Sequence, residues 1–263
     1  MTQAVNSHYL QLQDATLQST AATRLTGGYL QDIADVGGIL CVSGTAGLGK
    51  TVAVGTNLND LAPSSHRRLP TRPGLSLRDY RQVLATTFGI PPTPENLAGL
   101  TLESHIQQAV QAQRQVLFID EAHTLSNAIY ASLATLWDAC RGHLALAFVG
   151  NEHCPRRIRH AAPLASRIDY WQPYKPLTHA QVLEIIPKFH PQWAHVSESD
   201  LIWSDDAACR GNFRNWARFT RKLCLKNEQR GNPPGTFTQK LAREALQEFS
   251  SSEIWTGEDN QSW

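Results

Sequence analysis

The feature that most constrains this chain is a glycine-rich run at residues 44–51. Glycines at this spacing let the backbone curl so that successive N–H groups point inward at phosphate oxygens. We therefore expect a phosphate-binding loop. A glycine-rich turn that binds nothing is the alternative. The run consists of Gly44, Thr45, Ala46, Gly47, Leu48, Gly49, Lys50 and Thr51.

The sequence on either side of this loop fits a strand followed by a helix. Residues 39–42 form an apolar run typical of a buried strand, and Thr51 opens a helix whose positive end faces the loop. We expect Lys50 to contact the β- and γ-phosphates and the Thr51 hydroxyl to complete the shell of a Mg²⁺ ion. Binding of ATP or GTP is the resulting prediction.

A second apolar run, residues 116–119, ends in the carboxylates of Asp120 and Glu121. Four apolar residues suit a parallel strand buried on both faces, and ligands bind beyond the carboxyl ends of such strands. Asp120 is expected to hold Mg²⁺, and Glu121 to polarise a water for attack on the γ-phosphate. The alternative is that both residues only cap the next helix.

The residues that follow suggest two further assignments. Asp-Glu-Ala-His at 120–123 matches a helicase box, but such helicases need two nucleotide-binding lobes, and 263 residues with one phosphate loop provide only one. His123 is therefore interpreted as a helix-start residue. A third strand at 144–150 ends at Asn151, whose side chain is expected beside Asp120. A purely local role of Asn151 in the turn is the alternative.

With these motifs in place, the chain resembles an AAA+ ATPase: an α/β fold with a P-loop αβα core, a parallel sheet and a small helical lid. Within that superfamily it most resembles the MuB and TnsC transposition regulators and the related ExeA-type ATPases. The resemblance covers roughly residues 25 to 230. It rests on residues 44–51, on 117–125 (Leu-Phe-Ile-Asp-Glu-Ala-His-Thr-Leu), on 148–152 (Phe-Val-Gly-Asn-Glu) and on 211–214 (Gly-Asn-Phe-Arg).

The resemblance implies further roles. ATP is held by Lys50 with Mg²⁺ on Thr51 and Asp120, Glu121 activates water, Asn151 is the first sensor and Arg214 the second. Relatives assemble as rings or filaments in which a neighbouring subunit donates an arginine to the ATP site. The candidates for that arginine are Arg167, which we favour slightly, and Arg156, Arg157 and Arg159.

One stretch departs from the family pattern and also carries positive charge. Relatives show an apolar second strand, whereas residues 64–74 contain two prolines and little to bury, so we expect a strand that is short or at an edge. In the resembling filaments the region after this strand follows the DNA backbone. We therefore expect phosphate contacts, insensitive to base sequence, with a solvated basic loop as the alternative. The residues concerned are Arg67, Arg68, Arg72, Arg78 and Arg81.

A second basic feature recurs every four residues from 210 to 230. On a helix this spacing forms a slowly winding ridge opposite an apolar stripe. These like charges repel each other, and bound phosphate, from the nucleotide or from DNA, is one explanation of what offsets the repulsion. A solvated helix face is the alternative. The ridge contains Arg210, Arg214, Arg218, Lys222, Lys226 and Arg230, and the stripe Phe213, Trp216, Ala217, Thr220 and Cys224.

The whole chain sets wider bounds. We expect a polar arm or helix at 1–25, the nucleotide-binding core at 26–175, a lid at 176–249 opened by a capping box at Thr178, and a polar tail at 250–263 that is frayed or docks a partner. A net charge of +1 gives no general argument for nucleic acid. Five scattered cysteines fit a reducing compartment, and no run is long enough to span a bilayer, so a cytoplasmic protein is expected.

The resemblance thus implies an ATPase that assembles on double-stranded DNA when ATP is bound. It would mark a target for a transposase or another recombination protein and would disassemble on hydrolysis. The rivals are an ExeA-like envelope or secretion assembly ATPase, an ATP-switched protein scaffold without DNA binding, and a DNA-replication loader.

Overall fold

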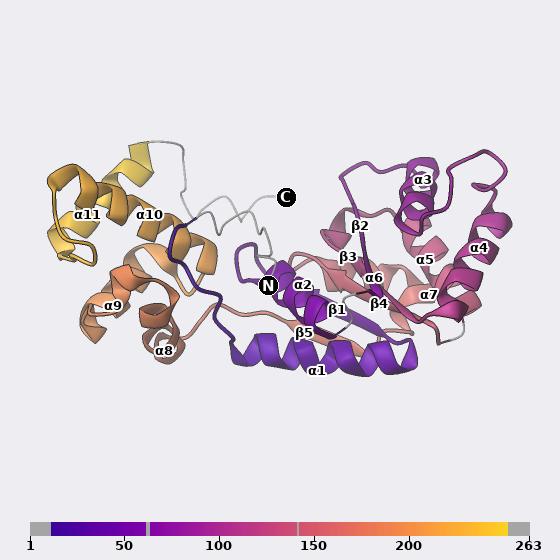
Figure 1. Cartoon of the computed structure of the whole chain (residues 1–263), viewed down its shortest axis with the longest axis horizontal. Helices are drawn as coiled ribbons and strands as arrows, with labels where there is room; N and C mark the ends of the chain where they lie inside the picture. The colour runs from indigo at the N-terminus through magenta and orange to yellow at the C-terminus, as the bar shows by residue number, and fades with distance from the viewer. Residues whose placement is uncertain (1–11, 62–63, 141, 252–263) are drawn as a thin grey trace. The chain divides into compact units, whose positions relative to one another are not determined.

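The protein is described here from a computed structural model that covers residues 12–61, 64–140 and 142–251. The chain divides into two compact units, and Figure 1 shows one of them as α/β and the other as helical. The core unit is Ala21–Lys175, and the C-terminal unit combines the residues before Ala21 with those from Pro176 onward. Residue 25, the predicted end of the N-terminal segment, lies inside the helix α1, Ala21–Val36. The predicted tail falls mostly outside the described residues.

In the described part of the core unit, five parallel strands form a single sheet in the order β2-β3-β4-β1-β5. The register pairs Ile39 with Leu146, Gln115 with Leu144 and His66 with Val116. The predicted α/β class with a parallel sheet is confirmed. The strands are β1 (Ile39–Ser43), β2 (His66–Leu69), β3 (Gln115–Ile119), β4 (Leu144–Val149) and β5 (Tyr170–Pro173).

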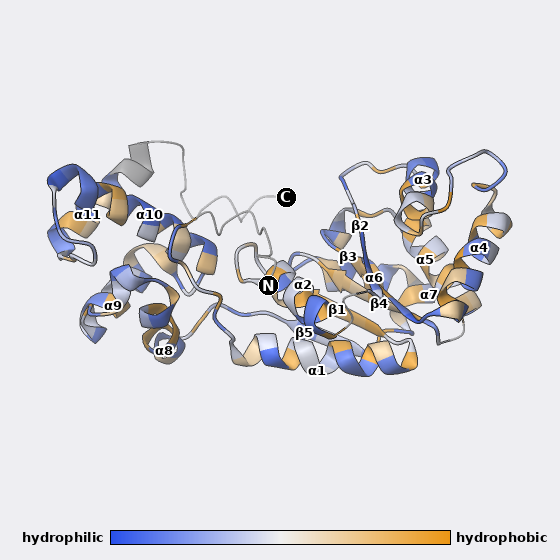
Figure 2. Cartoon of the chain, in the orientation of Figure 1, coloured by the Kyte–Doolittle hydropathy of each residue, from blue (hydrophilic) through white to orange (hydrophobic). Residues whose placement is uncertain are grey.

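The three central strands are buried on both faces because their side chains alternate between two hydrophobic clusters. On β1, Ile39 and Cys41 belong to one cluster, whereas Leu40 and Val42 belong to the other. The first cluster packs under α3 to α7 and the second under α1 and α2, and the apolar strands are visible in Figure 2. The helices are α2 (Lys50–Leu61), α3 (Leu77–Thr87), α4 (Gly99–Ala112), α5 (Asn127–Cys140), α6 (Cys154–His160) and α7 (Ala162–Ala165).

Strand β2 is much less buried than the central strands, as its sequence predicts. It has four residues, lies at the edge of the sheet, and buries only Leu69 completely. Arg67 and Arg68 therefore belong to a strand and not to the loop that follows it. The position of β2 beside β3 brings Arg68 close to the end of the acidic strand.

The C-terminal unit is a helical bundle with its own hydrophobic cluster, centred on Trp193, Trp216 and Phe219. The predicted capping box is present: the Thr178 side chain accepts a hydrogen bond from the Gln181 backbone, and the Gln181 side chain accepts one from the Thr178 N–H. The helices are α8 (His179–Phe189), α9 (Glu198–Ser204), a π-helical turn η3 (Asp205–Cys209), α10 (Phe213–Arg230) and α11 (Gln239–Ser251).

None of the helices in the described part of the chain has the length and apolar content needed to cross a bilayer. The five cysteines carry free thiols, and all but Cys224 are buried.

Candidate nucleotide-binding site

The phosphate loop joins β1 to α2 and has the backbone that its glycines predict. Gly44, Gly47 and Gly49 have φ of 143°, 88° and 88°, values that other residues rarely adopt. A Cβ on Gly44 would lie 2.6 Å from the Tyr174 carbonyl oxygen, so the loop has no room for a side chain there. The Lys50 ammonium, almost fully buried, donates to the carbonyls of Gly44 and Thr45 at 2.6 and 2.7 Å. This positive charge therefore lies across the loop, where a triphosphate needs it.

Thr51 and Asp120 meet although 69 residues separate them. The Thr51 hydroxyl donates to Asp120 Oδ1 at 3.2 Å, because β1 and β3 both end at the same edge of the sheet. A hydroxyl beside a carboxylate supplies the oxygen ligands that Mg²⁺ prefers. Lys50, Thr51 and Asp120 thus fit a triphosphate with its metal ion.

Arg68 in β2 and Thr71 just after it also contact Asp120, and the sequence did not identify either as part of this site. Arg68 Nη2 lies 2.7 Å from Asp120 Oδ2, and the Thr71 hydroxyl donates to the Asp120 backbone carbonyl at 2.5 Å. Arg68 also lies over the Phe118 ring, with 5.5 Å between the guanidinium carbon and the ring centroid. Pairing of Arg68 with Phe118 in the β2–β3 register is the signal that places this arginine near Asp120.

Glu121 follows Asp120 in a left-handed backbone conformation, with φ of 48°. Its N–H donates to Asp120 Oδ1 at 3.0 Å, and its side chain is 64% exposed. The Glu121 carboxylate lies 3.4 Å from His123 Nδ1, which the sequence interpretation treated only as a helix-start residue. An exposed carboxylate beside the expected metal ligand, Asp120, can polarise a water.

Asn151 lies just beyond β4, the strand next to β3. Its backbone N–H donates to His123 Nδ1 at 3.4 Å, and its side-chain oxygen accepts from the His153 N–H at 3.0 Å. The structure thus contains the local turn contact that was the alternative to a sensor role. Both interpretations of Asn151 are compatible with its place at this edge of the sheet.

The four arginines considered as trans-acting groups differ in what they contact. Arg167 makes a two-point ion pair with Asp138 of α5, at 2.8 and 2.7 Å. Arg157 donates to the Leu125 carbonyl at 3.0 Å, and Arg159 lies 4.8 Å from the Trp171 ring centroid. Arg156 is exposed and has no hydrogen bond or ion pair within the described residues.

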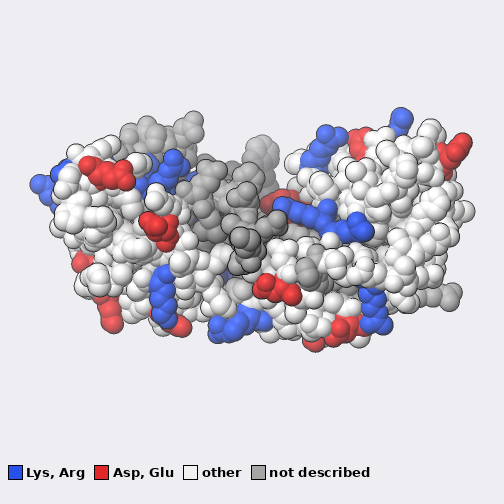
Figure 3. All heavy atoms as spheres, in the orientation of Figure 1, with Lys and Arg blue, Asp and Glu red and all other residues white. Residues whose placement is uncertain are grey.

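The arginines considered for DNA also separate into two groups. Arg67 donates to the Thr87 carbonyl at 2.9 Å and lies over Phe88, so it holds β2 against α3. Arg68 is paired with Asp120, as described above. Arg72 pairs with Asp79 at 3.3 Å and is exposed. On α3, Arg78 is exposed and Arg81 is half-buried. On the face shown in Figure 3, Lys and Arg side chains form separate groups, with uncharged and acidic side chains between them.

Arg214, the residue interpreted as the second sensor, lies half-buried in the first turn of α10. Asn212 caps this helix, because its side chain accepts from the N–H groups of Arg214 and Asn215 at 3.0 and 3.3 Å. The predicted apolar stripe is present in part. Trp216, Ala217 and Thr220 are buried, Phe213 and Cys224 are only half-buried, and the buried Phe219, Leu223 and Asn227 were not predicted.

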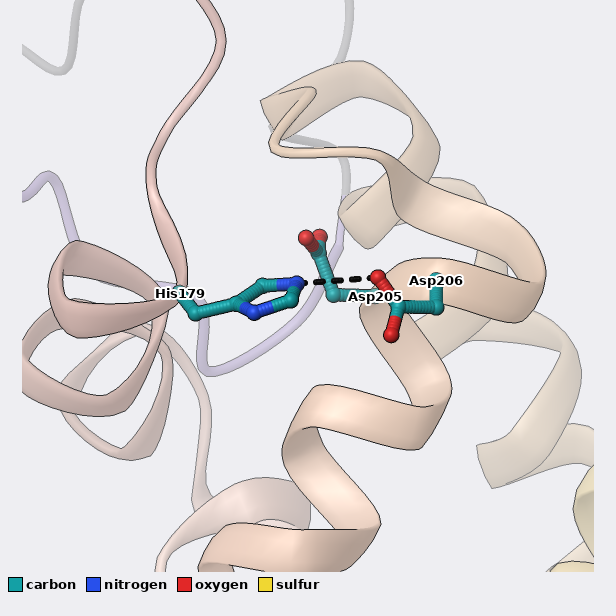
Figure 4. Close-up of side chains that lie close together, drawn as sticks. All are labelled: His179, Asp205 and Asp206. Atoms are coloured by element: carbon teal, nitrogen blue, oxygen red, sulfur yellow. Dashed lines mark hydrogen bonds and ion pairs between the residues drawn. The ribbon is translucent and has the colours of Figure 1, made fainter.

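A cluster of possible metal ligands lies in the same unit, at the start of α8 and in η3. The ligand atoms of His179, Asp205 and Asp206 lie within 4.8 Å of one another, and His179 Nε2 pairs with Asp206 at 2.9 Å (Figure 4). Asp205 Oδ1 accepts from the Gly211 N–H at 2.7 Å and from the Trp216 indole at 3.1 Å. These contacts give the cluster a structural role, which is to tie η3 to the starts of α8 and α10.

Comparison with known proteins supports this description of the core. Residues 34–158, which include the phosphate loop, Asp120 and Asn151, match a family described as AAA domain. Comparison with curated protein sequences gave no significant match.

Several solved structures have a similar fold at low sequence identity. Cdc6p from Pyrobaculum aerophilum aligns with a TM-score of 0.70 and 17% identity, over 93% of this chain and 71% of its own. The Drosophila ORC structure, solved bound to DNA, gives 0.66 and 18%, over 93% and 65%. The RuvB Holliday junction branch migration motor of Thermotoga maritima gives 0.58 and 15%, over 86% and 68%. Residues 34–158 therefore resemble an AAA domain, and the chain shares the fold of these solved structures.

Proposed function

We propose that this protein hydrolyses ATP, assembles on duplex DNA in its ATP-bound state, and marks a DNA target for a transposase or another recombination protein. The observation that carries the ATPase part is the contact between Thr51 and Asp120, with Glu121 directly after it. This contact unites the phosphate loop with the acidic strand at one edge of the sheet.

Each residue of the site has a defined part in this reaction. The N–H groups of the loop and the Lys50 ammonium bind the phosphates. Thr51 and Asp120 would hold Mg²⁺, which neutralises charge that develops on the phosphate oxygens. The Glu121 carboxylate orients a water and accepts its proton as the water attacks the γ-phosphate. The Glu121 side chain is largely exposed, so water has access to this carboxylate.

The ATPase proposal is tested with two substitutions that separate binding from hydrolysis. Lys50→Ala removes the ammonium on the loop and should abolish binding of a fluorescent ATP analogue. Glu121→Gln leaves the phosphate contacts intact, so it should bind ATP, hydrolyse it at a small fraction of the normal rate and accumulate as stable oligomers. Normal turnover in either variant would contradict the site assignment.

The DNA part of the proposal rests on exposed cations and on the nature of the similar folds. Arg72, Arg78 and Arg81 are the least constrained of the arginines near β2, and cations of this kind contact phosphates without reading bases. Proteins of similar fold include an ORC structure bound to DNA and a Holliday junction motor. We infer that α3 and the segment before it follow the DNA backbone.

Binding of a fluorescent random-sequence duplex, followed by anisotropy, tests this inference. Binding should require ATP or a non-hydrolysable analogue, fail with ADP, and weaken with salt. The double variant Arg78→Ala/Arg81→Ala should reduce the salt slope by about 2, since two phosphate contacts are lost. Arg218→Ala/Arg221→Ala on α10 is the matched control, because it removes two exposed arginines from the helix that carries most of the other basic feature. A loss only in the control pair would move the DNA contact to α10.

Assembly requires a residue that reaches the ATP of a neighbouring subunit. Arg156 is the best candidate among the four arginines, because Arg157, Arg159 and Arg167 are engaged within their own subunit. This differs from the preference for Arg167 that the sequence alone suggested. Dependence of assembly on the γ-phosphate then follows, since the guanidinium contacts that group only before hydrolysis.

The similarity to Cdc6p and ORC structures favours one alternative within the same class, a DNA-replication loader. If a transposase binds this protein once it has assembled on DNA, the recombination role is supported. An ATPase rate that does not change when DNA is added would instead favour the protein scaffold or the envelope ATPase.

A further inference from the structure

His123 lies in a short 3₁₀ turn, η1 (Ala122–Thr124), directly after Glu121. The turn is closed by Thr124, whose N–H and hydroxyl both donate to the Glu121 carbonyl, at 2.9 and 2.8 Å. The buried Tyr130 hydroxyl also donates to the Ala122 carbonyl, at 2.6 Å. These contacts fix the backbone that carries His123, while the neighbouring Glu121 side chain extends into solvent.

One atom of the imidazole has two neighbours from different parts of the site. His123 Nδ1 lies 3.4 Å from Glu121 Oε2 and also 3.4 Å from the Asn151 backbone nitrogen. Within the described residues, no other ion pair involves the Glu121 carboxylate. His123 is thus the contact between the expected general base and the tip of β4.

The two contacts require opposite states of the same nitrogen. Acceptance of the Asn151 N–H needs the lone pair of Nδ1, whereas a bond to the Glu121 carboxylate needs a proton on Nδ1. Nδ1 therefore serves one partner at a time. When it accepts from Asn151, the Glu121 carboxylate is left for water. When it donates to Glu121, that carboxylate is occupied.

The surroundings of His123 favour the first state. Burial lowers the pKa of His123, while the carboxylates of Glu121 and Glu152 oppose this shift and the cations Arg157 and Lys50 add to it. A neutral imidazole is therefore expected near pH 7, with its proton on Nε2 and Nδ1 as an acceptor.

We propose that His123 is a positioning residue for ATP hydrolysis, whose Nδ1 links the Glu121 carboxylate to the Asn151 backbone and so controls whether Glu121 faces water. This inference rests on the proposed ATPase function. In this proposal the histidine of the Asp-Glu-Ala-His sequence has a catalytic positioning role within a single nucleotide-binding lobe.

Steady-state ATPase kinetics of three variants test the proposal. His123→Ala removes the link, so kcat should fall about 10- to 100-fold, the scale expected for a misplaced catalytic group, while KM for ATP changes less than about twofold. His123→Asn places an amide near the position of Nδ1 and should restore most of kcat. His123→Gln places its amide near Nε2 and should resemble His123→Ala. A merely structural histidine would not show this order among the substitutions.

His153→Ala is the matched control, because it removes a nearby exposed histidine whose backbone contact with Asn151 is retained. Its kcat should stay within about twofold of the wild type. An unchanged kcat in His123→Ala, with the wild type active, overturns the inference and leaves the ATPase proposal intact. Absence of turnover in the wild type overturns the ATPase proposal.

A second measurement tests the contact between His123 and Glu121 without relying on ATPase activity. In ¹⁵N NMR spectra of the histidine side chains, Glu121→Gln should shift the Nδ1 signal of His123, and Glu152→Gln should shift it much less. No response of His123 to Glu121→Gln would show that the two side chains are not coupled, and the proposal would fall.

Discussion

Arg68 pairs with one oxygen of the Asp120 carboxylate, Oδ2, at 2.7 Å, while the other oxygen, Oδ1, accepts from Thr51 at 3.2 Å. The carboxylate expected to hold Mg²⁺ is therefore shared between a cation from β2 and a hydroxyl from α2. A guanidinium and a divalent cation compete for the same negative charge. The edge strand thus takes part in the chemistry of the site although it contributes little to the core.

Removal of Arg68 should make the site more receptive to Mg²⁺. The Arg68 side chain is 62% exposed, so its pairing energy is screened and the effect is modest. In Arg68→Ala we expect half-maximal ATPase activity at an Mg²⁺ concentration about two- to fivefold lower than in the wild type, the factor that corresponds to an exposed ion pair. Arg72→Ala, which breaks the pair with Asp79, serves as control. A higher Mg²⁺ requirement in Arg68→Ala would mean that Arg68 orients Asp120 and does not compete.

Arg156 and Arg167 should have different functions, with Arg156 acting on the ATP of a neighbouring subunit and Arg167 stabilising its own subunit. Arg156→Ala should leave the thermal midpoint unchanged and lower the ATPase rate only under conditions where the protein assembles. Arg167→Ala and Asp138→Ala should each lower the midpoint slightly, because both break the same ion pair. If Asp138→Ala left turnover intact while Arg167→Ala abolished it, Arg167 would be the trans-acting residue.

The stability of the C-terminal unit should decrease in mild acid because of His190. Nε2 of His190 lies 2.9 Å from the Gln13 carbonyl, and its Nδ1 accepts from the Gln192 N–H at 3.0 Å, so the neutral ring satisfies both. Burial lowers the pKa of His190 in the folded state. The unfolded chain then binds the proton more readily, so this contribution is fully present above about pH 6.5 and is lost as the pH falls through the lower folded pKa.

Thermal melts from pH 7.5 to 5.5 measure this effect. His190→Asn keeps an acceptor near Nδ1 but does not titrate, so its midpoint should be lower at pH 7.5 and should fall less on acidification. An equal fall in variant and wild type would assign the acid sensitivity to other groups.

Gly211 should tolerate substitution much less than Gly235, although both have positive φ, of 66° and 84°. A Cβ on Gly211 would lie 2.4 Å from the Leu177 carbonyl oxygen, whereas on Gly235 the nearest atom is the Pro191 oxygen at 3.8 Å. Gly235→Ala should cost about 1 kcal/mol from backbone strain alone, and Gly211→Ala roughly 2 kcal/mol or more because strain and collision add. Urea unfolding of the two variants provides the comparison, and equal losses would contradict it.

Prediction from sequence succeeded where residues close in the chain determine the structure. The phosphate loop, the strand that ends at Asp120 and the capping box at Thr178 are local patterns, and each is present. Even the weak second strand follows from its prolines and arginines. The α/β class could be predicted because strand and helix patterns alternate along the chain.

What the sequence could not show depends on strand register and on contacts across the sheet. Arg68 belongs to a basic stretch that suggested contact with DNA. Only its pairing opposite Phe118 in the sheet places it beside Asp120. His123 has an ordinary position at the start of a helical turn, and only the adjacency of β3 and β4 brings Asn151 to its ring. Arg167 is suited by sequence position to act in trans, but Asp138 is 29 residues away and no local pattern predicts their pair.

The close approach of Gly44 and Tyr174 has a mechanical consequence. Tyr174 donates its N–H to the Ser43 carbonyl at 2.6 Å, and its own carbonyl fills the space where a side chain at 44 would be. Tyr174 stands one residue before the point where the chain leaves the core unit, between Lys175 and Pro176. The first residue of the phosphate loop therefore lies directly against the segment by which the chain leaves the core unit, so a side chain at position 44 would displace that segment as well as the loop.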